Sequence, residues 1–342
     1  MGEFLIVGFV TGILLGFILR RGFFCMYNGF ANMVITKDYR IIRATIWAFL
    51  LTMLSFHTLS SLGIVALSPK PFFWVGSIVG AIVFALGMVL AGSCIVGTPL
   101  RAASGKIGYW FTLLGMGIGG WAVIWGPLAS FKQEVLQDAS KVMLGDKVPT
   151  LDILFGVNHW IIVAILSAIS IWLLFKLKNK NSAREARPKF FTGLWTPLAI
   201  GIGLAIVEVI ALVSGKSPAG LGGFIKGWGF YFNSLFTGEL PFGWPVAEVT
   251  GILVGVFLAA IIAKEFRIVL PKWKQVPRLF FGGIFMGLGA VTAAGGCNVA
   301  HIITHMPQLS IGSFVSGFTI IITATILISF IFKRNAGIGD DF

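Results

Sequence analysis

The chain has three cysteines, and each follows an apolar segment that contains glycine. Cys25 lies in RRGFFCMYNGF, Cys94 in AGSCIVGTPLR and Cys297 in AAGGCNVAHIITHMPQLS. A thiol is a weak S–H donor with a soft, polarizable sulfur atom, so it suits a ligand that itself presents sulfur. Three cysteines cannot all pair and none forms a CxxC motif, so we expect neither a disulfide framework nor a zinc knuckle. Simple packing is the alternative for each, because free cysteine is a common buried residue.

Two of the cysteine segments repeat one another. When Cys94 is superposed on Cys297, Gly92 falls on Gly295 without a gap, and a short polar segment with a proline follows each cysteine. Glycine allows a membrane helix to stop partway, and such broken helices mark the binding sites of transporters. The repeat therefore predicts paired helix breaks around a substrate site. The residues expected to contact the substrate are Cys25, Cys94, Cys297, Gly92, Ser93, Gly296 and Asn298.

Histidines offer a competing interpretation. Cys297, His301 and His305 are four residues apart, so on an α-helix they share one face and could hold a transition metal. A fourth ligand is not apparent, because His57 and His159 are expected near opposite membrane faces in other spans. A hydrogen-bonded structural histidine or a gate is the alternative to a metal ligand.

Three charged residues are accessory candidates. Glu208 and Glu248 lie within apolar segments. Intramembrane acids are functional candidates, and proton coupling is one such role. Both acids could equally cap a helix or pair with a buried arginine. Arg101 follows Cys94 and could draw an anion inward or anchor a cytoplasmic edge.

Composition places the chain in the membrane class. Hydrophobic residues make up 57% of the 342 residues and charged residues 11%, about half the charged fraction of a soluble domain. The net charge of +13 comes mostly from basic residues between the apolar runs, the pattern of cytoplasmic loops rather than of nucleic-acid binding. No nucleotide-binding fingerprint is present, so we do not expect ATP to be the direct energy source. The N-terminal segment is expected to be a retained helix.

The predicted fold is all-α and polytopic: a single transmembrane transport domain, 1–342, with about nine transmembrane helices and four re-entrant half-helix loops. Its halves, about 1–128 and 190–334, are joined by a linking helix at about 153–175. Because the link is one odd span, the halves insert in opposite senses and form an inverted repeat. The basic loops place the N-terminus outside and the C-terminus inside. The predicted spans are about 4–19, 42–67, 72–92, 107–128, 153–175, 194–213, 246–263, a span ending at 296, and 311–332; half-helices are expected around each cysteine and within 214–243.

The three cysteine motifs together resemble those of the YeeE/YedE family of bacterial inner-membrane sulfur-compound transporters, whose best-understood members take up thiosulfate. The resemblance implies that Cys25, Cys94 and Cys297 line a narrow central path among nine membrane helices with four inward loops. It also implies that the thiols hand thiosulfate inward through transient S–H···S contacts, with a small cytoplasmic TusA-type sulfurtransferase as partner and no cofactor. Where other members often carry Phe-Arg-Asp after the first motif, this chain has Gly29-Phe30-Ala31-Asn32.

The sequence thus favours a non-enzymatic uptake transporter for thiosulfate or a similar small sulfur anion, surrounded by lipid in the bacterial inner membrane and not bound to nucleic acid. One alternative is a membrane-embedded sulfurtransferase in which a cysteine forms a persulfide, which would require a thiolate with a lowered pKa. A second alternative is a transporter of a selenium compound, because some relatives are linked to selenium metabolism. A third is a transporter of a metal ion held by Cys297, His301 and His305.

Overall fold

The computed structural model describes residues 2–145, 147–177, 190–214, 223–238, 243–293 and 296–335. The described chain is helical apart from two short strands, β1 (Phe72–Phe73) and β2 (Lys141–Val142), which pair antiparallel. Strand β2 lies between the predicted spans 107–128 and 153–175, and the pairing ties this connection to β1.

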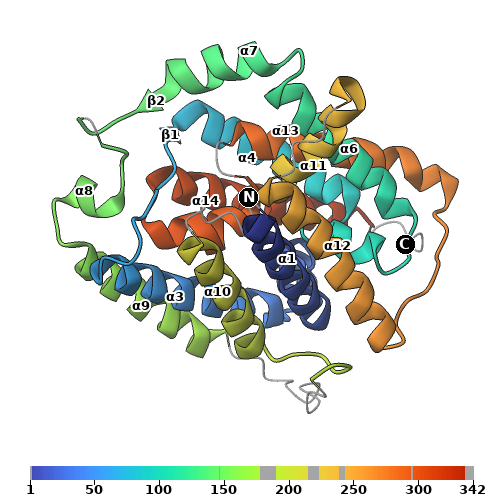
Figure 1. Ribbon diagram of the computed structural model, residues 1–342, viewed down its shortest axis with the longest axis horizontal. Coiled ribbons are helices and arrows are strands. Elements are labelled where there is room, and N and C mark those ends of the chain that lie inside the picture. The colour runs from blue at the N-terminus through green and yellow to red at the C-terminus, as the bar shows by residue number, and fades with distance from the viewer. Residues whose placement is uncertain are drawn as a thin grey trace.

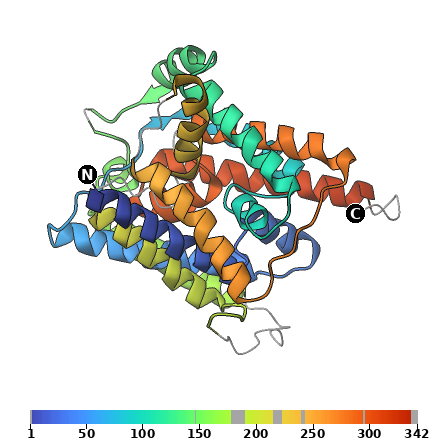
Figure 2. The same cartoon turned by 45° about the vertical axis from the view of Figure 1, so that its right-hand side comes forward.

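Each range in which the sequence predicts a span contains one long helix (Figures 1 and 2). The long helices are α1 (Gly2–Gly22), α3 (Arg40–Ser61), α4 (Trp74–Ala91), α6 (Gly108–Ile124), α9 (His159–Lys176), α10 (Pro197–Val213), α12 (Trp244–Ile262), α13 (Val276–Thr292) and α14 (Ile311–Asn335). The shorter ones are α2 (Met26–Ile35), α5 (Gly97–Ala102), α7 (Ala129–Phe131), η1 (Lys132–Gln137), η2 (Asp138–Ser140), α8 (Leu151–Phe155), α11 (Gly223–Thr237), η4 (Trp273–Gln275), η5 (Ala300–His305) and η6 (Met306–Gln308).

Six helical segments of the described chain are long and apolar enough to cross a membrane, or seven if the bent pair 108–124 and 129–140, at 64°, counts as one span. Helix α10 is apolar but has only 17 residues, fewer than the roughly 20 that usually span a bilayer. The protein is therefore a mostly helical, multi-pass membrane protein. The count of nine spans with four re-entrant loops stays a prediction.

The predicted linking helix at 153–175 is interrupted. Helix α8 ends at Gly156, whose φ of 62° is left-handed and stops the helix. Asn158 then caps α9 by accepting a hydrogen bond from the backbone two residues further on, at 3.0 Å. The long helix of this link consequently begins at His159, and it packs against α3.

Glycines set the closest helix contacts. Helix α1 lies along α12 in both views (Figures 1 and 2), and a Cβ at Gly12 or Gly16 would strike the α12 backbone. From the other side, Gly251 and Gly255 meet the α1 backbone in the same way. Glycines four residues apart on α1 thus form a close-packing surface for α12.

A second glycine seam surrounds α13, which packs between α4 and α6. A Cβ at Gly283 or Gly287 would strike backbone oxygens of α6, and one at Gly289 would strike the α4 backbone. Helix α10 packs on α3, and α14 on α4. These seams bring the ends of the broken helices together, so the three cysteines lie in one buried apolar cluster.

Candidate functional site

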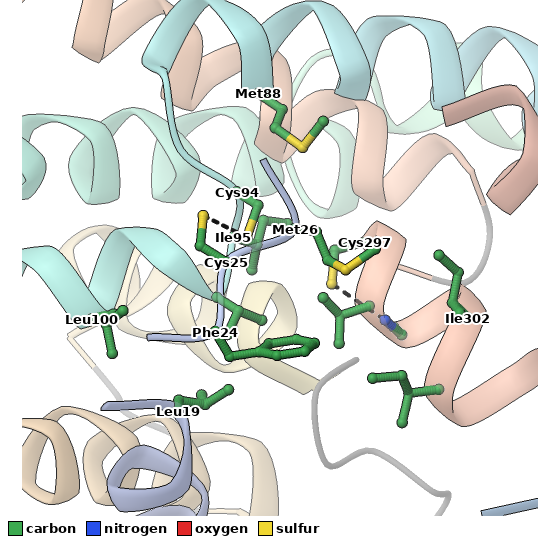
Figure 3. Packing of buried hydrophobic residues seen from close by; sticks show 14 of the residues in the cluster. Leu19, Phe24, Cys25, Met26, Met88, Cys94, Ile95, Leu100, Cys297 and Ile302 are labelled. Atoms are coloured by element: carbon green, nitrogen blue, oxygen red, sulfur yellow. Dashed lines mark hydrogen bonds between the residues drawn. The ribbon is translucent and has the colours of Figure 1, made fainter. Parts of the chain in front are cut away.

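Two of the three cysteines meet although 69 residues separate them. Cys25 is the residue before α2, with an extended φ of −144°, and Cys94 lies just past the left-handed Gly92 that ends α4 (φ 63°). Their Sγ atoms are 3.5 Å apart, a contact in which either thiol can donate (Figure 3). Both thiols are free and fully buried. The sequence-predicted breaks therefore bring two sulfur atoms together without a covalent bond.

Gly97, the first residue of α5, fits against this pair. Its backbone N–H donates to the Cys94 Sγ at 3.3 Å, and the Thr98 hydroxyl donates to the Cys94 carbonyl at 2.9 Å. A Cβ at Gly97 would collide with the Cys25 Sγ. The hydroxyl of Ser93 would be a second close neighbour of that Cβ, so the predicted Ser93 also borders the pair. Gly97 is a site residue that the sequence analysis did not single out.

Cys297 repeats this local arrangement in the second half. It follows Gly296, whose φ of 103° is left-handed, and its Sγ accepts a hydrogen bond from the N–H of Ala300, three residues further on, at 3.4 Å. Cys94 accepts from the residue three further on in the same way. Gly295, the sequence-aligned partner of Gly92, lies outside the described residues. Each of the two cysteines thus sits at a glycine break with a backbone donor on its sulfur.

Methionines continue the set of sulfur atoms. The amide of Asn298 donates to the Met88 Sδ at 3.6 Å, which links the Cys297 segment to α4. The hydroxyl of Thr45 donates to the Met26 Sδ at 3.1 Å. In Figure 3, Met26 lies between the Cys25–Cys94 pair and Cys297 in this view. Sequence analysis missed both methionines because an isolated methionine in an apolar run is usually a core residue.

Arg101 joins three elements around the cysteine pair. Its guanidinium donates to the Gly92 carbonyl at the end of α4, to the Tyr109 hydroxyl of α6 at 2.8 Å and to the Asn28 side chain of α2 at 2.9 Å. The guanidinium also lies over the Tyr109 ring, 5.0 Å from its centroid. Neither partner side chain was predicted, because they are 8 and 73 residues away and only the fold brings them together.

Positive charge gathers near Arg101. Lys106 lies in the short connection between α5 and α6, and burial together with repulsion from Arg101 and Arg20 lowers its pKa. Arg20 and Arg21 both contact the Glu265 carboxylate, at 2.9 and 2.7 Å. Sequence analysis did not predict this acid, since it lies in a segment that is mostly basic. The end of the molecule beside Cys25 and Cys94 is therefore cationic.

The predicted intramembrane acids are both fully buried. Glu208 lies in the interior of α10, and its Oε1 accepts a hydrogen bond from the Thr304 hydroxyl of η5 at 3.0 Å. Glu248 lies in the second turn of α12, so neither acid is the N-cap of its helix. The second half thus connects an acid directly to the segment that follows Cys297.

The proposed metal set is not assembled. Residues 300–305 form a π-helix rather than the α-helix that the metal interpretation assumed. The rings of His301 and His305 are 6.4 Å apart between centroids. Among the described residues, no group of three His, Cys, Asp or Glu side chains is placed to hold a metal ion. This arrangement weighs against the metal interpretation.

His57 and His159 were expected near opposite faces, and this was wrong. Their rings stack at 5.2 Å with an interplanar angle of 20°. The reason is that the linking helix begins at His159, beside the end of α3 that carries His57. The His57 Nε2 lies 3.0 Å from the Pro307 carbonyl, and both histidines line a cavity of about 360 Å³ with Lys147 and Asp152.

The comparisons with known proteins cover nearly the whole chain. A sequence model of the family described as Sulphur transport matches residues 21–326. "Thiosulfate transporter TsuA" of Spirochaeta thermophila is 32% identical over 339 residues, covering 96% of this chain and 99% of that protein. "Thiosulfate transporter TsuA" of Escherichia coli is 31% identical over 317 residues, covering 88% and 87%. "Probable transporter YedE" of Escherichia coli is 31% identical over 110 residues, covering 32% and 26%.

These relatives carry the names of transporters, not of enzymes. The resemblance to the YeeE/YedE proteins, first indicated by the three cysteine motifs, is therefore confirmed, and the chain belongs to the Sulphur transport family.

Proposed function

We propose that this protein takes up thiosulfate across the bacterial inner membrane, along a path lined by Cys25, Cys94 and Cys297. Two relatives that align over most of their length are named thiosulfate transporters, which supports the substrate. The observation that carries the path is the 3.5 Å contact between the Cys25 and Cys94 sulfur atoms at the junction of two broken segments. In such a contact, the terminal sulfur of thiosulfate can replace one thiol as the acceptor of S–H.

The helix packing supports an inverted repeat of halves 1–128 and 190–334. If α1 corresponds to α10 and α3 to α12, the α1–α12 contact becomes the α10–α3 contact, and both occur. The same exchange of halves turns the α6–α13 contact into the α14–α4 contact, and both occur as well. This pairing favours nine spans, with α2, α5, α11 and the η5–η6 segment as the four inward elements. The linking helix α9 then stands outside the repeat.

Orientation follows from the basic ends of the helices. Arg20 and Arg21 end α1, and Lys264, Arg267 and Lys272 follow α12. We assign this end to the cytoplasm, because short basic loops are retained there. The N-terminus is then periplasmic and the C-terminus cytoplasmic. Cys25 and Cys94 belong to the cytoplasmic side and Cys297 to the periplasmic side.

The structure corresponds to a closed state of the proposed path. No more than 2% of any of the three cysteines is exposed, so an ion reaches the thiols only after the inward segments separate. On the cytoplasmic side, the hydrogen bonds of Arg101 hold α2, α4 and α6 together. We assign Arg101 two roles. Its positive charge attracts the dianion. When its guanidinium then bonds the anion instead of Gly92, Tyr109 and Asn28, the contacts that hold the cytoplasmic side closed are weakened.

The inner face also suits the proposed TusA-type partner. Near the basic residues after α12, Leu270 and Trp273 are 76% and 77% exposed. A small cytoplasmic protein that accepts the imported sulfur would find apolar and cationic contacts together there. Copurification of a TusA-type protein with this chain, lost in Trp273→Ala, tests this assignment.

Uptake of labelled thiosulfate into proteoliposomes tests the function. We expect uptake by the wild-type protein and strongly reduced uptake by Cys94→Ser, because serine is nearly the same size but lacks the polarizable sulfur. Thr98→Ser is the matched control, since it keeps the hydroxyl that bonds the Cys94 carbonyl. Absence of uptake by a correctly inserted wild-type protein would contradict the proposal. A stable persulfide found by mass spectrometry after thiosulfate treatment would instead favour the sulfurtransferase alternative.

A further inference from the structure

Two acids in the second half of the chain are buried, and a negative charge on either would repel an anion in the proposed path. Glu208 and Glu248 have no exposed surface, and their sequence neighbours Val207 and Val249 belong to the main apolar cluster. An ionised carboxylate in such surroundings is strongly destabilised unless it is paired or hydrogen-bonded. Both acids therefore need either a partner or a proton in the closed state.

Of the two acids, Glu248 has the fewer hydrogen-bond partners. The Trp244 indole interacts with it from one turn earlier on α12, yet neither carboxyl oxygen accepts a hydrogen bond of normal geometry. It forms no salt bridge in the described part of the chain. The carboxyl of Glu208 acts electrostatically on that of Glu248, and the two carboxylates would repel each other if both were ionised. A proton bound to either carboxyl would remove this repulsion.

Glu208 connects this acid pair to the cysteine path. Its Oε1 accepts a hydrogen bond from the Thr304 hydroxyl at 3.0 Å, in the η5 segment that begins three residues after Cys297. A dianion beside Cys297 would therefore be repelled by ionised glutamates and admitted by protonated ones. That is a physical reason for the anion to move only when protons are bound.

The surrounding elements place their titratable groups as follows. On α1, Arg20 and Arg21 contact Glu265, and on α3, His57 contacts the Pro307 carbonyl. On α11, the Tyr231 hydroxyl bonds Thr250 and Lys226 is exposed. On α5, Arg101 bonds Gly92, Tyr109 and Asn28. The η5 segment contributes His301 and His305, which flank Thr304 in sequence and belong to the same buried region.

The charge of the substrate sets the number of protons. A membrane potential that is negative inside opposes entry of a dianion twice as strongly as entry of a monovalent anion. Two carboxyls can bind two protons, which together balance the two negative charges. In one cycle, two O–H bonds form with protons from the outside and break to release them inside, and no other bond changes.

We propose that Glu208 and Glu248 form a proton-binding pair that couples the entry of one thiosulfate dianion to the entry of two protons. This inference rests on the proposed thiosulfate transport. It adds the energy source and predicts that net transport carries no charge.

The experiment uses the full-length protein in liposomes with a pH-sensitive dye inside. With the membrane potential clamped at zero by potassium and an ionophore, adding thiosulfate outside should acidify the interior. A gradient of one pH unit, acid outside, should drive accumulation to about 100-fold, tenfold for each of two protons. Changing only the membrane potential should leave the uptake rate unchanged.

Glu208→Gln and Glu248→Gln should each abolish the stimulation by the pH gradient while keeping exchange of thiosulfate for thiosulfate. Glu134→Gln, which changes an exposed acid, is the matched control and should behave as the wild type. If the glutamine variants fail to insert, the wild-type measurements of acidification and of potential dependence still decide the question. Wild-type exchange with neither acidification nor gradient stimulation would overturn the coupling alone. Absence of wild-type exchange would overturn the thiosulfate function on which it rests.

Discussion

The helix breaks at Cys94 and Cys297 share a backbone geometry but differ in what surrounds the thiol. In both, a glycine with positive φ lies one or two residues before the cysteine, and a backbone N–H three residues on donates to its sulfur. Cys94 has in addition a second thiol at 3.5 Å, and Arg101 hydrogen-bonds the nearby Gly92. Cys297 is followed instead by Asn298, whose amide reaches a methionine sulfur, and by a π-helical turn.

This difference indicates that the two breaks have different tasks. A repeated backbone can present a sulfur atom twice, but of the two breaks, as far as the described residues show, the one at Cys94 combines a second thiol with the nearby guanidinium of Arg101. We therefore expect thiosulfate to be selected at the Cys25–Cys94 pair. The break at Cys297 would mainly admit the ion and respond to the state of Glu208, through Thr304.

Gly97→Ala should have the largest effect, because its Cβ would collide with the Cys25 Sγ and separate the pair. Overpacking of this kind costs about 1–3 kcal/mol, so thiosulfate uptake should fall by about 5- to 150-fold. Gly203→Ala is the control, since its Cβ meets only the flexible side chain of Ile18. Uptake rates in proteoliposomes, normalised to inserted protein, measure both. A Gly97→Ala protein with normal uptake would mean that the close sulfur contact has no role in transport.

Serine substitutions test the two breaks against each other. Cys94→Ser removes the contact with Cys25 as well as one with the substrate, and a weak contact is worth about 0.5–1 kcal/mol, so we expect about a tenfold loss of uptake. Cys297→Ser removes one such contact, and about a threefold loss should follow. Excess sulfate, which lacks the soft sulfur, should inhibit the wild type weakly. Equal losses in the two variants would remove the distinction between the breaks, and strong inhibition by sulfate would mean that charge alone is recognised.

Features of the two breaks that depend on neighbouring residues could be predicted from the sequence. Contacts between residues far apart in the sequence could not. The breaks at Gly92 and Gly296 follow from residue type, since glycine adopts the left-handed backbone more readily than any other residue. The Cys25–Cys94 contact and the Arg101–Asn28 hydrogen bond join residues about 70 positions apart and depend on how helices pack.

Two predictions about histidines were wrong because the local backbone differs from a regular α-helix. The prediction that Cys297, His301 and His305 share one face assumed a regular α-helix, but the backbone is left-handed at Gly296 and π-helical from residue 300 to residue 305. The helix stop at Gly156 moved the start of the linking helix and brought His159 onto His57. Neither feature has a signal in composition or in apolar periodicity.

Arg101→Lys should reduce uptake by about fivefold. Lysine keeps the charge but cannot reach Gly92, Tyr109 and Asn28 at once, and an unmade hydrogen bond to a buried group costs about 1–3 kcal/mol. Arg278→Lys, an exposed position on α13, is the control. Initial uptake rates over a range of thiosulfate concentrations separate the two roles: a raised KM reports lost attraction of the anion, and a changed maximal rate reports altered opening. If the Arg101→Lys protein has wild-type kinetics, the positive charge of Arg101 is the functional feature and its hydrogen bonds are not.

Met88→Leu is the smallest and most specific change. Leucine has nearly the volume of methionine, so packing should change little, but the sulfur that accepts from Asn298 is lost. Met53→Leu is the matched control, because Met53 is equally buried but belongs to a separate apolar cluster, with Leu50, Ile162, Val163 and Leu309, that contains none of the cysteines. We expect about a twofold loss of thiosulfate uptake in Met88→Leu, the size of one weak sulfur contact, and none in Met53→Leu. The loss should add to that of Cys297→Ser only partly, since both changes act on the segment that contains Asn298. Full additivity would mean that Met88 acts independently of the break at Cys297, and an effect as large as that of Cys94→Ser would show that selection is shared between the two breaks.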